Sequence, residues 1–277
     1  MSSLFRRFGA GLLALFACAA TCRSATLRIC ADPNDLPFSN SARQGLDNRI
    51  GALLAHDMGR TPVFVWARSR RGFLRETFNK GACDVLMGVP VGMKAVATSI
   101  PYYRSSYVFV TPAREHLAIA SFSDPRLNGR RIGLQILEED MSPPSLPLIR
   151  SGHAAQLVGF PSFGSEAGEI VQAVAKERVG VAVVWGPLAG YYAQRLHLPV
   201  TLTAVEPAVD SSGIPFSFDL AVGVHRGDKD LLGVVNASLA RLRPQIQSIL
   251  SAYHVPLADS TAVPNVRRSA GRSEGGL

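Results

Sequence analysis

The stretch GVPVGMKAVATSIPYYRSSYVFVTP, residues 88–112, begins as a loop with glycine and proline and ends as a long apolar strand. Upstream of it, strand-like runs at 26–31, 62–66 and 83–89 alternate with helical patterns. Alternation of this kind predicts a parallel β-sheet covered by α-helices. The stretch therefore ends one α/β unit, and its segment 107–111 is expected to lead the chain out of that unit.

Two helices are expected between the strands of this unit. The first has Leu46, Ile50, Leu53, Leu54 and Met58 on one face, places Asp47, Arg49 and Asp57 off that face, and is followed by Gly59 as a stop signal. The second is expected at about 71–80, because Gly72 and Gly81 bound a pattern that turns Phe73, Leu74 and Phe78 inward.

A second α/β unit follows, with strands at 130–135, 155–160, 180–185 and 200–205 and helices at about 165–176 and through Tyr191 and Leu196. A loop at 206–217, a returning strand at 218–224 and a helical pair broken by Pro244 come next. Two units joined by an outgoing and a returning strand predict two lobes with two crossing segments. Ligands of open parallel sheets bind beyond the carboxyl ends of the strands, so function is expected in a cleft between the lobes.

The first 25 residues have the features of an export signal. Arg6 and Arg7 precede an apolar run at 8–20 that is too short to span a bilayer, and cleavage is expected between Ala20 and Ala25. A lipoprotein signal that uses Cys18 is the alternative, although Phe16 is bulky for such a site. The protein is therefore expected in the periplasm.

The charge of the chain disfavours a nucleic-acid partner. Residues 1–25 hold three arginines and no acidic residue, so their removal lowers the formal net charge from +8 to +5. The basic residues are dispersed, whereas a nucleic-acid site needs a basic stripe interleaved with aromatic residues. A mildly basic surface can still help the protein to dock on an acidic partner.

Cysteine, histidine and acidic residues give no sign of a metal site or of catalysis. Cys30 and Cys83 remain in an oxidising compartment, where they either form a disulfide or lie too far apart to do so. The six histidines are scattered, and neither GxSxG nor a P-loop occurs. Glu138, Glu139 and Asp140 form either a solvated acidic loop or a weak cation site. We therefore expect no bound metal or cofactor and no enzymatic activity.

Several motifs together resemble one family. CADPNDLPFSN, CDVLMGVP, PYYRSSYVFV and VVWGPLAGY occur in this order, and the similarity runs from Leu27 to Tyr253. The chain resembles type-2 periplasmic binding proteins of solute-binding protein family 3. Within them it is similar to the MxaJ/XoxJ group, which is associated with pyrroloquinoline-quinone (PQQ)-dependent alcohol dehydrogenases, above all methanol dehydrogenase.

The resemblance implies a two-lobe Venus-flytrap fold, each lobe a mostly parallel sheet covered by helices. Together with the signal and the composition, it predicts the following organisation: signal peptide 1–25, lobe one from 26–110 and 210–256, lobe two from 111–209, and a disordered tail at 257–277.

The chain departs from the amino-acid-binding relatives of that family. Those relatives grip the ligand carboxylate with an arginine soon after the third strand, but no arginine lies between Gly88 and Tyr103. Trp185 stands where they place an aspartate for the ligand ammonium, and Glu138, Glu139 and Asp140 stand near their anion-binding helix start. An α-amino-acid ligand is therefore not expected.

The candidate cleft residues follow the strand ends and the crossing segments. They are Asp32, Asn34, Phe38, Asn40, Arg71, Pro90, Tyr102, Tyr103, Arg104, Gln135, Trp185, Tyr191 and Asp219. Trp185 is expected to form an aromatic platform, and one of the two adjacent tyrosines to face the cleft while the other is buried. The polar members have alternatives: turn chemistry for Asp32, Asn34 and Asn40, a solvated turn for Arg71, a surface charge for Arg104, and a hinge acceptor or surface residue for Asp219.

Two functions are compatible with this pattern. The first is a periplasmic accessory factor of a PQQ-dependent alcohol dehydrogenase system, which acts by binding the dehydrogenase or a related small molecule. The alternative is a receptor that delivers a small non-amino-acid solute to an ABC transporter by hinge closure. A lyase or dehydratase also occurs on this fold, but the sequence lacks the catalytic residues for it.

Overall fold

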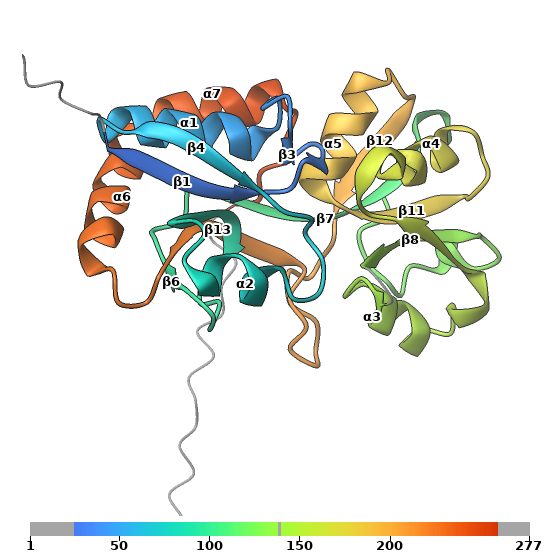
Figure 1. The fold of residues 1–277 in the computed structure, drawn as a ribbon. Helices are drawn as coiled ribbons and strands as arrows, with labels where there is room; N and C mark the ends of the chain where they lie inside the picture. The colour runs from blue at the N-terminus through green and yellow to red at the C-terminus, as the bar shows by residue number, and fades with distance from the viewer. Residues whose placement is uncertain (1–24, 138–139, 260–277) are drawn as a thin grey trace, which may run out of the picture.

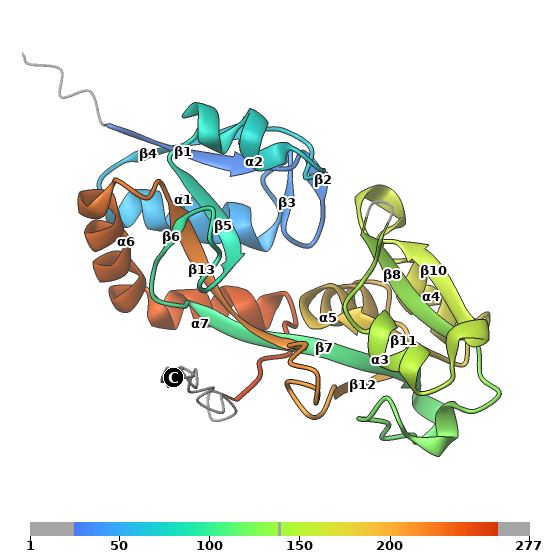
Figure 2. The same cartoon turned by 90° about the horizontal axis from the view of Figure 1, so that it is seen from below.

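The computed structural model describes residues 25–137 and 140–259. Residues 1–24 of the expected signal sequence and residues 260–277 of the expected tail lie outside this part, as do Glu138 and Glu139. Most of the described strands form one mixed sheet, with the order β10-β8-β11-β7-β13-β5-β1-β4 along its main path, and β2 and β3 form a separate two-stranded sheet. Figures 1 and 2 show this sheet bent into two lobes, each with its own helices. The α/β fold with two lobes predicted from the sequence is confirmed.

Lobe one is built on parallel strands β1 (Thr26–Ala31), β4 (Thr61–Trp66) and β5 (Val85–Pro90). Helices α1 (Leu46–Asp57), α6 (Lys229–Arg241) and α7 (Arg243–Ala252) cover one face of this sheet and bury aliphatic side chains such as Leu27, Ile50 and Leu239. Helix α2 (Phe73–Glu76), the 3₁₀ helix η1 (Phe78–Lys80) and β6 (Ala97–Thr98) belong to the other side. The N- and C-terminal parts of the chain thus share one hydrophobic core.

Lobe two is built on parallel strands β8 (Ile132–Leu137), β10 (Leu157–Pro161) and β11 (Val181–Trp185). Strand β12 (Val200–Ala204) adds to β7 in antiparallel orientation. Helices α4 (Glu169–Ala175) and α5 (Gly186–Arg195) pack on one face, and α3 (Ser145–Arg150) lies toward the other. Two buried clusters, one on each face, fill the lobe.

Strand β7 (Tyr103–Pro112) belongs to both lobes. Its residues Tyr103–Ser106 pair with β13 (Ser217–Val224), and its residues Tyr107–Val110 pair with β11. Figure 2 shows β7 running from one lobe into the other. The strand is almost entirely buried because it carries side chains into both cores. The outgoing and returning strands predicted from the sequence therefore lie side by side as an antiparallel pair.

The shorter elements complete the chain. They are β2 (Asn34–Asp35), β3 (Ser39–Asn40), β9 (Asp140–Met141), η2 (Ala113–Glu115), η3 (Pro125–Leu127), η4 (Ala154–Gln156) and η5 (Gly164–Glu166). Beyond Pro256, where a tail was expected, Leu257 forms an isolated bridge with Ser105.

The single helix expected at 71–80 is wrong in detail. The chain forms α2, breaks at Thr77, and continues as η1, because Thr77 Oγ1 donates a 2.5 Å hydrogen bond to the Phe73 carbonyl and the turn tightens there. Likewise, the helix expected at 165–176 starts with the 3₁₀ turn η5 before α4. Helix α3 was not expected at all.

The structure joins Cys30 and Cys83 in a disulfide, with Cα atoms 5.5 Å apart. Cys30 lies near the end of β1, and Cys83 lies two residues before the neighbouring strand β5. Both cysteines are buried among Phe78, Leu86 and Val96. The parallel pairing of β1 with β5 is what brings together two residues that are 53 positions apart.

Candidate functional site

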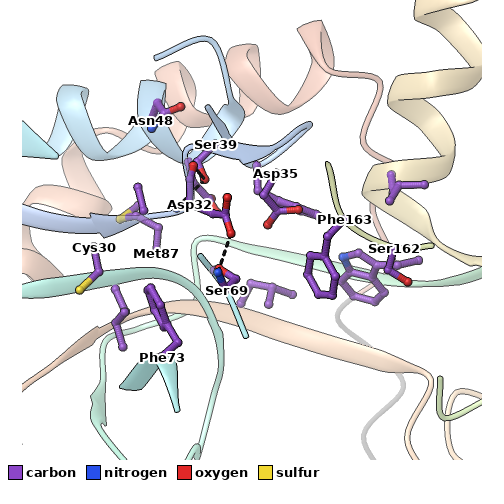
Figure 3. A pocket seen from close by; sticks show the side chains of 18 of the residues that line it. Cys30, Asp32, Asp35, Ser39, Asn48, Ser69, Phe73, Met87, Ser162 and Phe163 are labelled. Atoms are coloured by element: carbon purple, nitrogen blue, oxygen red, sulfur yellow. Dashed lines mark hydrogen bonds between the residues drawn. The ribbon is translucent and has the colours of Figure 1, made fainter. Parts of the chain in front are cut away.

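A cavity of about 400 Å³ lies between the two lobes, beyond the carboxyl ends of β1, β5, β8 and β11. Most of its wall is apolar or aromatic. The largest such side chains are those of Phe38, Phe64, Phe73, Met87, Tyr103, Tyr107, Phe163, Trp185 and Phe218. Figure 3 shows the lobe-one side, with Asp32 and Asp35, facing Phe163 and Ser162 of lobe two. The cavity therefore has the size and the walls of a small-molecule site.

Asp32 is a structural acceptor at the end of β1. Its carboxylate accepts hydrogen bonds from the Asn34 N–H at 2.7 Å and the Ser69 N–H at 2.5 Å. Ser39 Oγ donates to the Asp32 carbonyl at 2.8 Å and accepts from its N–H at 3.1 Å. These bonds tie the loop after β1 to the loop after β4, so Asp32 shapes the cavity wall as the turn chemistry predicts.

Asp35 and Asp47 are two further carboxyl groups in this wall, and neither has a basic partner in the described structure. Burial, followed by the charges of Asp32 and Asp47, raises the pKa of Asp35 to about 8. Burial raises the pKa of Asp47 to about 7, although Tyr102 Oη donates to it at 3.2 Å and opposes the rise. Asp47 lies in the first turn of α1, where the helix dipole also favours the anion.

Two buried polar atoms of the cavity wall lack a partner in the described structure. Asn48 is 1% exposed; its Oδ1 accepts from the Asn40 and Gly45 N–H groups, which leaves Nδ2 without an acceptor. Ser162, from the loop after β10, is 5% exposed, and its Oγ has no partner. A buried polar group without a hydrogen bond costs about 1–3 kcal/mol, and both residues line the cavity.

The raised pKa values make a prediction about stability. Between the ordinary pKa of 3.8 and the folded value of about 8, folded Asp35 keeps a proton that the unfolded chain has released. The free energy of unfolding should therefore fall as the pH rises through this window. The groups that face Asp35 and Asp47 are Asp32, Tyr102, Tyr103 and, from α5, Tyr192.

We expect Asp35→Asn to flatten the pH dependence of the melting temperature. The wild type should lose roughly 5 °C between pH 5 and 8.5, on the order of 1–2 kcal/mol, and the variant clearly less. Calorimetric melting across this range measures the effect. Asp230→Asn, on the exposed first turn of α6, is the matched control and should follow the wild type. Parallel curves for wild type and Asp35→Asn would contradict the assignment.

Some of the candidate residues predicted from the sequence line the cavity, and others do not. Asp32, Phe38, Pro90, Tyr103, Gln135 and Trp185 line it. Gln135 Oε1 accepts from the Trp185 N–H at 2.7 Å, so it holds the end of β11. Tyr102 lies behind the wall, where its Oη accepts from the Gly88 N–H at 2.9 Å and donates to Asp47. One tyrosine of the pair thus faces the cavity and the other supports it.

Arg104 and Asp219 do not line the cavity. They are opposite each other on β7 and β13, and their side chains form an ion pair at 2.9 Å. The Arg104 side chain is 10% exposed, so the idea of a free surface charge is wrong, and its pairing also argues against a cation that reaches into the cleft. The pair fastens the two crossing strands to each other.

Asn34, Asn40 and Tyr191 also lie outside the cavity wall. Asn34 and Asn40 pair as β2 and β3, and Asn40 Oδ1 accepts from the Gln44 N–H at 2.8 Å. Tyr191 stacks on Tyr253 with ring centroids 5.8 Å apart, where α5 meets the end of the chain. Their physical role in the structure is to hold a loop and an interlobe contact.

Arg71 lies at the mouth of the cleft. A second hollow of about 690 Å³ opens there, lined by Arg70, Arg71, Gly72, Phe73, Leu74, Arg75, Asn79, Ala95, Leu137, Phe163 and Ser69. It shares Ser69, Phe73, Leu137 and Phe163 with the cavity. We call this hollow the mouth groove. It combines an apolar floor with three arginines from the loop after β4 and from α2.

The sequence-based prediction missed Asp35, Asp47, Asn48, Ser162 and Phe163. Asp47 was assigned to the outward face of its helix, but it lies in the first turn, which starts next to the strand ends. A usable signal was present: the first turn of a helix that follows a strand-end loop faces the same edge of the sheet as that loop. Ser162 and Phe163 likewise lie just beyond a predicted strand, that at 155–160, and directly follow the observed strand β10.

No group of three or more His, Cys, Asp or Glu side chains within 25–137 and 140–259 is placed to hold a metal ion. Among the same residues, no helix is long and apolar enough to cross a membrane.

The chain is similar to known proteins, although no family model matches it. Over 255 residues it is 34% identical to Protein MoxJ of Methylorubrum extorquens AM1, covering 84% of this chain and 81% of the relative. Over 270 residues it is 30% identical to Protein MoxJ of Paracoccus denitrificans, covering 91% of this chain and 97% of the relative.

Two solved structures are also similar. MxaJ from Methlophaga aminisulfidivorans MPT has a TM-score of 0.73 and 27% identity, and the periplasmic binding protein XoxJ from Methylobacterium extorquens AM1 has 0.71 and 28%. In both cases the match covers 84% of this chain and 100% of the other. Ancestral amino-acid-binding proteins match at about 20% identity, which shows the fold alone.

Proposed function

The chain belongs to the MoxJ/MxaJ/XoxJ family of periplasmic binding proteins, and from this membership we propose that it is an accessory factor of a PQQ-dependent alcohol dehydrogenase system. It works in the periplasm after export by its N-terminal signal and acts by binding, without catalysis. The partner is the dehydrogenase, with methanol as the expected class of alcohol. The lobes comprise 26–110 with 210–256, and 111–209, and close on what binds between them.

The observation that carries this proposal is a cleft that is built for binding but unsuited to an α-amino acid. Among residues 25–137 and 140–259, no Arg, Lys or His lines the cavity, so the described wall offers no cationic side chain to hold a carboxylate. Lobe two contributes the aromatic side chains of Trp185 and Phe163 to the wall. Lobe one contributes the carboxyl groups of Asp32, Asp35 and Asp47. The wall therefore favours a partner or ligand other than an α-amino acid, one that fits the aromatic surfaces and the open mouth.

The mouth groove is the part of the cleft that best fits a protein surface. Its floor is formed by Phe73, Leu74, Leu137 and Phe163, and Arg70, Arg71 and Arg75 flank it. Phe163 and Leu137 are exposed although they are large and apolar. Apolar anchors surrounded by arginines favour a partner that presents acidic residues around an apolar side chain.

Charge reversal at the mouth tests this docking surface. We expect Arg70→Glu to slow association with the dehydrogenase roughly tenfold at low salt, and the difference to shrink at high salt. Stopped-flow or surface-plasmon-resonance kinetics measure this. Arg226→Glu, in the exposed turn between β13 and α6, carries the same charge change away from the groove and should behave like wild type. Equal rates for both variants would contradict docking at the mouth.

A second candidate is a receptor that delivers a small non-amino-acid solute to an ABC transporter. The unpartnered Asn48 and Ser162 atoms on opposite lobes support it, because a ligand that bonded both would hold the lobes together. A thermal-shift screen separates the two functions, since a thousandfold excess of a true ligand stabilises by about 4 kcal/mol. Tight binding of one solute without any binding of the dehydrogenase would favour the receptor.

A further inference from the structure

The charged lining of the interlobe cavity has one sign. Asp32, Asp35 and Asp47 line it, and no basic side chain of the described part of the chain does. Arg104, a basic residue of the candidate set, does not line the cavity and forms an ion pair with Asp219. The ionisable acidic and basic side chains that a ligand meets in this described wall are thus all carboxyl groups, so an anionic group would be repelled and a cationic group attracted.

The three carboxyl groups differ in how far the protein satisfies them. Asp32 accepts two backbone N–H bonds, whereas Asp47 has one long bond from Tyr102 Oη. No hydrogen bond to the Asp35 carboxyl group occurs in the described structure. Asp35 and Asp47 therefore have free acceptor capacity in a wall that is otherwise largely apolar, and a donor from the ligand would fill it.

Two further atoms indicate that the cavity takes a ligand with polar groups. Asn48 Nδ2 and Ser162 Oγ are buried, line the cavity and have no partner among the described residues. Asn48 follows Asp47 directly on α1, whereas Ser162 comes from lobe two (Figure 3). A ligand that reaches both lobes would satisfy atoms that are otherwise left unpaired.

The rest of the cavity wall indicates that the uncharged part of the ligand is apolar or aromatic. Phe163 and Trp185 of lobe two and Phe38, Phe73 and Tyr103 of lobe one offer aromatic surfaces. Aromatic faces attract cations and pack against apolar groups. A bare metal ion does not fit, because no group of three or more ligating side chains in the described ranges converges on a point. The mouth arginines are solvent-exposed and screened, so the inner carboxyl groups act more strongly on a bound charge.

We propose that the interlobe cavity binds an organic ammonium group on an apolar or aromatic body, with Asp35 and Asp47 as the charge partners and Ser162 as the contact from lobe two. The inference rests on the proposed function, since it names what the cleft of the accessory factor holds. The ammonium group belongs either to a free amine or to a lysine side chain or N-terminus of the dehydrogenase.

Three probes with the same phenylethyl body and different end groups test the charge preference. The purified protein is titrated calorimetrically at pH 8 with 2-phenylethylammonium, with its neutral isostere 2-phenylethanol and with 3-phenylpropanoate. The fluorescence of Trp185 reports occupancy, because the only other tryptophan, Trp66, does not line the cavity. We expect the ammonium ion to bind at least about tenfold more tightly than the alcohol, and the carboxylate not to bind. Affinity for the ammonium ion should rise from pH 6 to 8.5, as both carboxyl groups lose their protons.

Variants assign the charge partners. Asp35→Asn and Asp47→Asn should each weaken binding of the ammonium ion about tenfold or more, with little effect on the alcohol, whereas Asp230→Asn should leave both unchanged. Ser162→Ala should weaken both. If the Asp47→Asn variant does not fold, the Asp35→Asn variant and the pH dependence of ammonium binding still test the inference. Equal affinity for the ammonium ion and the alcohol, or a preference for the carboxylate, would overturn the inference, as would binding of calcium chloride alone that Asp47→Asn abolishes.

Competition identifies the source of the ammonium group. If 2-phenylethylammonium displaces the dehydrogenase, the group comes from the partner; if both bind together, it comes from a free amine, and both results support the inference. No binding of any amine, with dehydrogenase binding that Arg70→Glu weakens, would overturn the inference and leave the proposed function intact. If the wild-type protein binds the amine but does not bind the dehydrogenase, only the proposed function is overturned.

Discussion

Replacement of both Cys30 and Cys83 with alanine is expected to lower the free energy of unfolding by about 2–5 kcal/mol. The disulfide closes a loop of 53 residues and lies in a buried cluster that joins β1 to the segment before β5. Its loss gives the unfolded chain more freedom and leaves a gap under the cavity wall, where Cys30 lies. Urea denaturation, followed by far-UV circular dichroism, measures the difference.

A reductant provides the control for this prediction. Dithiothreitol should bring the wild-type unfolding midpoint close to that of the double variant and should leave the variant unchanged. Coincident midpoints for the oxidised wild type and the variant would show that the bridge does not support the fold.

Gly190→Ala is expected to cost about 2–3 kcal/mol and to disturb how the lobes meet. Gly190 lies on α5 of lobe two, and a Cβ there would stand 1.9 Å from the backbone oxygen of His254. Neither side can yield easily, since one is a helix and the other is the backbone of the segment after α7. Unfolding in urea gives the energy, and small-angle X-ray scattering shows whether the lobes move apart.

Gly233→Ala is the matched control, because it makes the same substitution in an exposed position of α6 where a Cβ would meet nothing within 4 Å. It should stabilise the protein by about 0.5–1 kcal/mol, since alanine favours the helix. A Gly190→Ala protein as stable as this control would refute the close packing of α5 on the chain end.

The fold could be predicted from the sequence because its signals are local. Strands β1, β4 and β5 are short apolar runs between helical patterns, and each came within two residues of its position. The passage of β7 from one lobe to the other could also be predicted, since a largely apolar strand of ten residues is longer than one small sheet needs. The break in the helix at Thr77 could not be predicted from the sequence, because it depends on a hydrogen bond from the Thr77 side chain to the backbone.

The residues of the cavity wall could be predicted from the sequence only where they lie at or near the ends of strands. Asp32 follows β1, Trp185 ends β11 and Gln135 lies two residues before the end of β8, so topology alone places them near the cleft. Asp35 and Asp47 reach the same wall only because the loop after β1 folds back on α1. Arg104 could not be excluded beforehand, since its pairing with Asp219 depends on the register between β7 and β13.

The function proposed for this protein, action on a dehydrogenase system through the interlobe cleft, can be tested in cells. Its direct test is dehydrogenase activity in a strain that lacks the gene and is complemented by variants. Ser162→Trp fills part of the cavity from a buried wall position, and Ser251→Trp places the same side chain on the exposed end of α7. At equal periplasmic levels, wild type and Ser251→Trp should restore activity and Ser162→Trp should not. Full activity with Ser162→Trp, or in the uncomplemented strain, would contradict the account.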